Sequence, residues 1–128
     1  MTRQAIGNFD ITMTPTGAPG NPIGTMALAK TYRGDLSGMS TGHMLAFRSA
    51  VEGSAGYVAM ERVTGVLEGR EGAFTLQHNG LMDKGVPSLS VVVVPDSGSE
   101  DLVGLTGSLD IIISPGRHDY KFTYNLPE

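Results

Sequence analysis

The stretch that decides the fold is ERVTGVLEGREGAFTLQHNG, residues 61–80. Apolar and polar residues alternate on both sides of the segment 68–71, which is typical of two half-buried strands joined by a tight turn. The apolar parity puts Leu67 of the first strand and Phe74 of the second on the same side of the hairpin. We therefore predict a β-hairpin with one face against a core.

The same alternation runs through the rest of the chain, and no window shows apolar residues at helical spacing for three turns. Short strands joined by tight turns can bury one face and remove their edges by closing into a barrel. We predict one all-β domain over residues 1–128, an eight-stranded antiparallel up-and-down β-barrel, with a two-sheet sandwich as the alternative. The predicted strands cover residues 4–14, 24–33, 38–48, 56–67, 72–80, 88–94, 102–113 and 118–126.

Composition narrows the range of functions. The chain has no cysteine and a net charge of -4, and its nine Lys and Arg residues are scattered, so we expect no nucleic-acid partner. No apolar run is long enough to span a bilayer, and MTRQAIGNFD at residues 1–10 does not resemble a signal peptide, so we expect a cytoplasmic protein without a membrane partner. The three histidines lack metal-ligand spacing, and we expect neither a metal nor a cofactor.

Glu61 and His78 share the predicted inner face of the hairpin, and they are the candidate catalytic residues. If the loop is 68–71, the two lie directly opposite each other; a six-residue loop makes them diagonal neighbours, and a five-residue loop separates them. A buried carboxylate beside an imidazole is either a satisfied structural contact or a tuned acid and base. In the wrong register, Arg62 and Gln77 face inward instead.

Other inward-facing side chains are candidates for ligand binding. Aromatic rings on the last strand either cradle an apolar ligand or fill the core. His43 faces either the lumen or the solvent. Lys30 shares the parity of Tyr32, and we expect its ammonium group to reach the barrel mouth. The candidate ligand-binding residues are Tyr32, His43, Tyr57, Phe74, Leu76, Gln77, Tyr120, Phe122 and Tyr124.

Three segments carry a family resemblance: KTYRGDLSG (30–38), the hairpin at 61–80, and VVPDSGSEDLVGLTGSL (93–109). In this order they resemble the bacterial family of domain of unknown function 3224, whose members look like the allene oxide cyclase barrel. The resemblance implies an eight-stranded barrel, similar in shape to lipocalins and dirigent proteins, that often forms oligomers. The family has no assigned reaction. Allene oxide cyclase closes a fatty-acid-derived epoxide in an apolar cavity, but none of its catalytic residues can be carried over to this chain.

Three functions follow as hypotheses. In the first, the lumen binds a small apolar or amphipathic molecule, with Glu61, His78 and Gln77 holding its polar end. In the second, the protein is an isomerase or cyclase in which Glu61 or His78 moves a proton. In the third, the lumen is filled and the protein is a structural module. Valines on both faces of 88–94 further predict a homodimer or other homo-oligomer.

Overall fold

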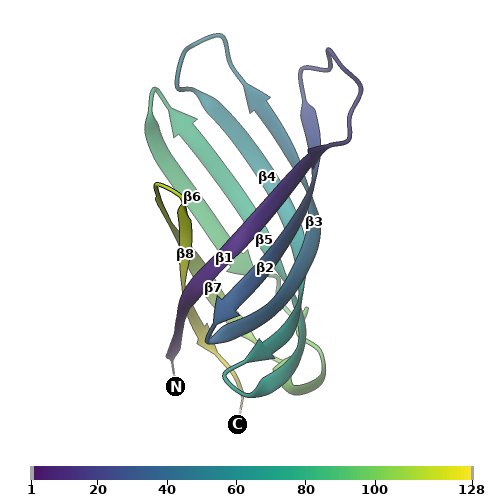
Figure 1. Ribbon diagram of the computed structural model, residues 1–128, viewed down its shortest axis with the longest axis vertical. Helices are drawn as coiled ribbons and strands as arrows, with labels where there is room; N and C mark the ends of the chain where they lie inside the picture. Colours follow the sequence, from purple (N-terminus) through teal and green to yellow (C-terminus); the bar gives the residue numbers. More distant parts are fainter. Residues whose placement is uncertain (1, 128) are drawn as a thin grey trace.

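Eight antiparallel strands surround a lumen in the computed structural model, which describes residues 2–127 (Figure 1). The predicted fold class is confirmed. Only one short 3₁₀ helix, η1 (Glu100–Leu102), interrupts the strands among the described residues. The strands are β1 (Arg3–Pro15), β2 (Gly24–Gly34), β3 (Leu36–Arg48), β4 (Ala55–Leu67), β5 (Arg70–Asp83), β6 (Val86–Val93), β7 (Thr106–Ser114) and β8 (Arg117–Asn125).

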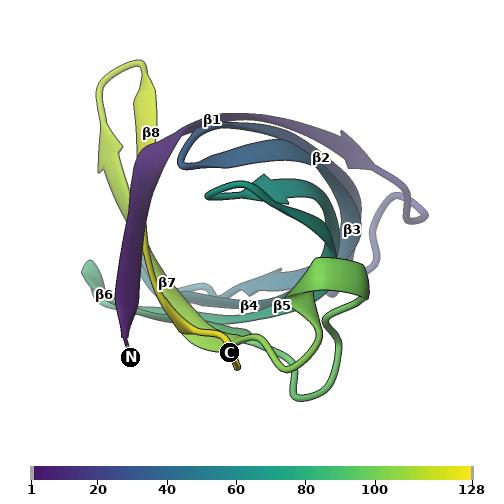
Figure 2. The ribbon, with the colours of Figure 1, turned by 90° about the horizontal axis from the view of Figure 1, so that it is seen from below.

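Each strand pairs with its neighbours in sequence, and β8 pairs with β1 to complete the ring. Seen from below, the strands run around a central space (Figure 2). This is the predicted up-and-down order, and it follows from the short connections between consecutive strands. Between residues 2 and 127 there is no helix with the length and apolar character needed to cross a membrane. The cytoplasmic location stays a prediction.

The β4–β5 turn is tighter than the sequence indicated. Glu68 and Gly69 form a two-residue turn with φ values of 46° and 87°, as in a type I′ hairpin. Leu67 pairs with Arg70, so the predicted four-residue loop is wrong and the register moves by two residues. Because side chains alternate with a period of two, this shift leaves every predicted inner residue of the hairpin on the inner face.

The seventh strand begins later than expected, at Thr106 rather than at residue 102. The preceding segment instead continues along β5: the backbone N–H of Ala73 donates to Ser99 Oγ, and that of Thr75 donates to Ser97 Oγ. In this segment η1 turns Leu102 into the core, where it is fully buried. The segment therefore covers the lower end of the barrel, the end where the termini lie in Figure 1.

The strand pairing around the barrel is least extensive between β6 and β7, which share a single residue pair, Val92 with Ser108. Val91 and Val93 point into the barrel and are buried, whereas Val92 points outward. Valines thus lie on both faces of the strand, as expected, and the two inward-facing ones belong to the core. Above this pair, the edge of β6 that faces β7 has no backbone pairing. The facing edge of β7 is likewise unpaired.

The lumen is divided into a filled lower half and an open upper half. In the lower half, Phe122 stacks between Phe74 and Tyr124, with ring centroids 5.7 and 5.2 Å away. All three rings are buried. In the upper half, Leu89 and Ile113 have inward parity but remain 44% and 72% exposed, so the side chains do not fill this space. A functional site inside the lumen would therefore lie at the boundary between the halves or above it.

Candidate functional site

A buried carboxylate lies at the boundary between the filled and open halves. Glu61 is 1% exposed and accepts four hydrogen bonds. Its Oε1 accepts from the Tyr32 hydroxyl at 2.5 Å and from the Ser40 hydroxyl at 2.9 Å. Its Oε2 accepts from Lys30 Nζ at 2.7 Å and from His78 Nε2 at 2.6 Å. We call these five side chains the Glu61 cluster.

The cluster is assembled from four consecutive strands. Lys30 and Tyr32 come from β2, while β3, β4 and β5 each contribute one member, all with inward parity. Gly42 of β3 pairs with Glu61, and a Cβ on this glycine would lie 2.7 Å from the Glu61 Cα. A glycine here permits the close approach of the two strands beside the carboxylate. Among the described residues, no buried side-chain N or O atom lacks a hydrogen-bond partner.

The surroundings of Glu61 keep it ionised. Burial raises its pKa, but the hydrogen bond from His78 and the charge and hydrogen bond of Lys30 outweigh burial and lower the pKa to about 2. A carboxylate has about four lone-pair sites, and all of them are occupied here. Glu61 therefore has no free lone-pair site to offer a ligand. The prediction that Lys30 reaches the barrel mouth is wrong, because its ammonium group pairs with this buried carboxylate.

His78 connects the cluster to the open half of the lumen. Its Nε2 must carry a proton, because the ionised Glu61 can only accept. Its Nδ1 lies 3.4 Å from the Tyr57 hydroxyl. Tyr57 is half-buried, and its ring lies over Gly80, where an added Cβ would be 2.3 Å from a ring carbon. The three residues form a chain from Glu61 through His78 to Tyr57 that ends at open space.

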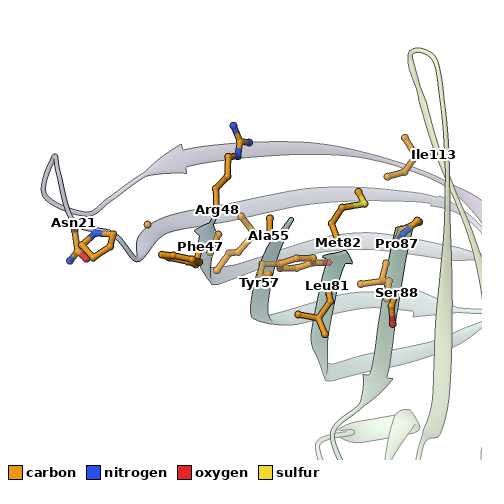
Figure 3. Close-up of a pocket in the computed structure, with 17 residues that line it drawn as sticks. Asn21, Phe47, Arg48, Ala55, Tyr57, Leu81, Met82, Pro87, Ser88 and Ile113 are labelled. Carbon is orange, nitrogen blue, oxygen red and sulfur yellow. The ribbon is translucent and has the colours of Figure 1, made fainter. Parts of the chain in front are cut away.

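That open space is a cavity of about 620 Å³ in the upper lumen (Figure 3). In Figure 3, Met82 and Pro87 project to one side of the sheet and Ile113 extends from another strand, while Leu81 points away from them. The walls are mostly apolar. The side chains that line the cavity with inward parity include Met44, Ala46, Tyr57, Met82, Leu89 and Ile113.

The structure brings together some of the candidate residues and separates others. Glu61 and His78 meet, as diagonal neighbours on β4 and β5. Tyr32 belongs to the same cluster, and Tyr57 borders the cavity. The candidates in the filled core, away from the cavity, are Phe74, Leu76, Tyr120, Phe122 and Tyr124.

Two candidate ligand-binding residues lie outside the lumen. His43 and Gln77 are exposed on the outer face of the barrel, each beside Met60 of β4. His43 has the parity of Leu45 and Phe47, which are apolar but also point outward. Apolar residues on both sides of β3 make its inner face ambiguous in the sequence. Neither side chain can contact a ligand in the cavity from this position.

Two members of the Glu61 cluster are not predicted by the sequence pattern. The parity of Lys30 indicates an inward-facing side chain but does not identify its partner, and Ser40 is not among the candidates. The signal for Ser40 is its parity with Leu36, a buried residue on the same strand. The part of the chain from 2 to 127 holds no group of three or more side chains that could bind a metal ion.

Similarity to known proteins covers nearly the whole chain. The family described as "Protein of unknown function (DUF3224)" matches residues 5–124. A crystal structure of a DUF3224 protein of unknown function from Shewanella oneidensis MR-1 is 43% identical, covers 100% of this chain and 99% of its own, and superposes with a TM-score of 0.93. No curated protein matches the chain. These comparisons do not confirm the resemblance to allene oxide cyclase.

Proposed function

Since this chain belongs to the DUF3224 family, whose description assigns no activity, we propose a function from the geometry of its lumen. The barrel binds a small apolar or amphipathic molecule in its upper half. The observation that carries the proposal is the cavity of about 620 Å³ with mostly apolar walls. Its volume lies within the roughly 300–1,000 Å³ typical of small-molecule sites.

The exposure of the cavity wall supports this proposal. Leu89, Ile113 and Met82 all have inward parity, yet each keeps at least 40% of its surface exposed. Leaving apolar side chains in water is unfavourable, and a ligand that covered them would gain about 25 cal/mol for each Å² removed from water. The flexible thioether of Met44 and that of Met82 can adapt to the shape of the ligand.

Native mass spectrometry of freshly purified protein tests the proposal, together with titration of an apolar fluorescent dye. We expect a retained small molecule or saturable dye binding. The variant Ala46→Trp places a large ring inside the cavity and should abolish both signals. Ala29→Trp is the matched control, because Ala29 is exposed on the outer face of β2. Equal dye binding by the two variants would contradict binding in the lumen.

A second candidate function is that of an isomerase or cyclase. The contact between His78 and Tyr57 favours it, because a proton can pass between the lumen and His78 through the tyrosine hydroxyl. In this version Glu61 orients His78 instead of touching the substrate. A β,γ-unsaturated ketone that binds should become conjugated, with a rise in ultraviolet absorbance, and His78→Gln should retain binding but lose this turnover. Unchanged turnover in His78→Gln would remove the acid–base role.

The third hypothesis, a structural module with a filled lumen, fits only the lower half of the barrel. There, aromatic side chains occupy the interior. The cavity in the upper half is too large to be a packing defect, since native cores hold few voids larger than a water molecule. A packing role alone therefore does not explain the upper half of this barrel.

For oligomeric state, the proposal remains a homodimer, now through a different surface. Exposed apolar residues gather on the outer face of the upper β3–β4–β5 sheet: Leu45, Phe47, Val58, Met60 and Leu81. A second copy related by a twofold axis would cover this surface with the same surface. Light scattering after gel filtration should give a dimer for the parent and a monomer for Leu81→Glu. A monomeric parent at micromolar concentration would contradict the proposal.

A further inference from the structure

Tyr57 is the polar group that the cavity presents below its rim. Four residues with polar side chains line the cavity: Asn21, Arg48, Tyr57 and Ser88. Asn21 lies in the β1–β2 loop, and Arg48 is the last residue of β3, so both lie at the rim. Ser88 pairs with the outward-facing Leu81 and shares its outward parity. Among the described lining residues, a ligand that enters the lumen therefore meets one polar side chain.

The polar end of the cavity carries no free cation among the described residues. Lys30 is the nearest buried positive charge, but its Nζ donates to Glu61 Oε2 at 2.7 Å, and the residue is 3% exposed. Its charge compensates that of Glu61, which leaves the pair neutral. His78 donates through Nε2 to Glu61, its Nδ1 lies 3.4 Å from the Tyr57 hydroxyl, and the residue is 3% exposed, so both of its ring nitrogens already have partners. The floor of the cavity thus presents a polar hydroxyl group but no free cation among the described residues.

The lack of a free cation at the cavity floor determines which polar group of a ligand can bind there. A carboxylate would lose its hydration there without gaining a cation, and burying an unpaired charge is far more costly than burying a hydroxyl that finds a partner. A phenol has one proton and two lone pairs: Tyr57 can accept from a ligand hydroxyl while its hydrogen bond with His78 Nδ1 stays in place, and it can donate to a ligand carbonyl when its proton turns away from this 3.4 Å contact. Burial, and secondarily the charge of Glu61, raise the pKa of Tyr57, which keeps this phenol protonated.

We infer that Tyr57, supported by His78, recognises the polar end of the ligand, and that this ligand is a neutral molecule with an apolar body and one hydroxyl or carbonyl group. The inference rests on the proposed function of the lumen. It excludes a ligand whose carboxylate lies at the cavity floor. It also specifies the polar group of the ligand, which the apolar walls alone do not determine.

Three probes of equal chain length test the inference: decan-1-ol, decan-2-one and decanoate. Their affinities are measured by displacement of an apolar fluorescent dye, at a pH where decanoate is ionised. We expect the alcohol and the ketone to bind at least about tenfold more tightly than decanoate, which corresponds to about 1.4 kcal/mol. Tyr57→Phe should weaken the alcohol and the ketone about three- to tenfold, the range of one net hydrogen bond, without changing dye affinity.

The matched control is Tyr124→Phe, which removes a hydroxyl from the filled half of the lumen and should leave all three affinities unchanged. Equal or tighter binding of decanoate by the parent would overturn the inference, as would an unaltered alcohol affinity in Tyr57→Phe. If Arg48→Gln abolished decanoate binding and Tyr57→Phe did not, the inference would be wrong. The ligand would then be an anion bound by Arg48 at the rim. Absence of binding for dye and probes together would overturn the proposed function itself, whereas dye binding without chemical preference would overturn only the inference.

Discussion

Lys30 of β2 and Glu61 of β4 form a buried ion pair across the intervening strand β3, with Nζ 2.7 Å from Oε2 and both side chains less than 4% exposed. Removing two charges from water is costly, and the cost is offset only while each charge faces the other with its remaining hydrogen bonds made. Ser40 on β3 donates one of those bonds. The pair therefore joins three strands through one carboxylate.

A double-mutant cycle should show strong coupling between these two residues. Lys30→Met and Glu61→Gln should each lower the free energy of unfolding by about 3–5 kcal/mol, because each leaves an uncompensated buried group. The double variant should lose much less than the sum of the two. Urea denaturation measures all four free energies. As a control, Asp10→Asn removes the exposed pair with Arg33 and should cost under about 1 kcal/mol, whereas additive losses at Lys30 and Glu61 would contradict the coupling.

Stability should fall on acidification because of Glu61. Its pKa drops from an ordinary value of 4.5 to about 2 in the folded protein, so the folded state binds this proton less readily than the unfolded chain. The contribution is fully present above pH 4.5 and is lost as the pH falls toward 2. Its size is of the order of 3 kcal/mol. Thermal unfolding across this interval should show a flatter pH profile for Glu61→Gln than for the parent, and parallel profiles would refute the assignment.

The two halves of the lumen should respond differently to truncation. Phe122→Ala removes a fully buried ring from between Phe74 and Tyr124 and should cost about 3–5 kcal/mol, because the stack cannot collapse around the void. Ile113→Ala changes an inward residue that is 72% exposed and should cost less than about 1 kcal/mol. Chemical denaturation compares the two variants. Similar losses would mean that the upper half is packed as tightly as the lower half.

The alternation of residues predicted the fold and the inner face of most strands, because a strand has a period of two and one buried face. It placed Glu61, His78, Phe74 and Leu76 in the barrel, and the structure agrees. It failed on β3, because Leu45 is apolar but faces outward. Parity therefore could not predict which side of this strand faces the lumen.

The alternation of apolar and polar residues could not predict the β4–β5 register or the hydrogen-bond partners of Glu61. Glu68 adopts a positive φ that is uncommon outside Asn, Asp and Gly, so the residue types at this turn carry no strong signal of a two-residue loop. The Lys30–Glu61 contact depends on how tightly the sheet curls across β3, since cross-strand rules relate only adjacent strands. Likewise, no local pattern predicts that β6 and β7 pair only at Val92 and Ser108, or that Leu89 and Ile113 of these strands stay exposed in the cavity wall.

Gly80 should matter for ligand binding although it lies outside the Glu61 cluster. It pairs with Tyr57 on the inner face, and an alanine Cβ would lie 2.3 Å from a carbon of the Tyr57 ring. In Gly80→Ala the ring must therefore move, which separates its hydroxyl from His78. We expect this variant to lose affinity for decan-1-ol about as much as Tyr57→Phe does, about three- to tenfold.

Gly24→Ala is the control for the Gly80 substitution, because Gly24 also lines the cavity but an added Cβ there meets its nearest atom, the Ala46 carbonyl oxygen, only at 3.8 Å. This variant should keep the parent affinity. Both substitutions add one methyl group to the same cavity, so a difference between them isolates the position of the Tyr57 ring. If Gly80→Ala bound decan-1-ol as the parent does while remaining folded, the hydroxyl of Tyr57 would not be what holds the ligand.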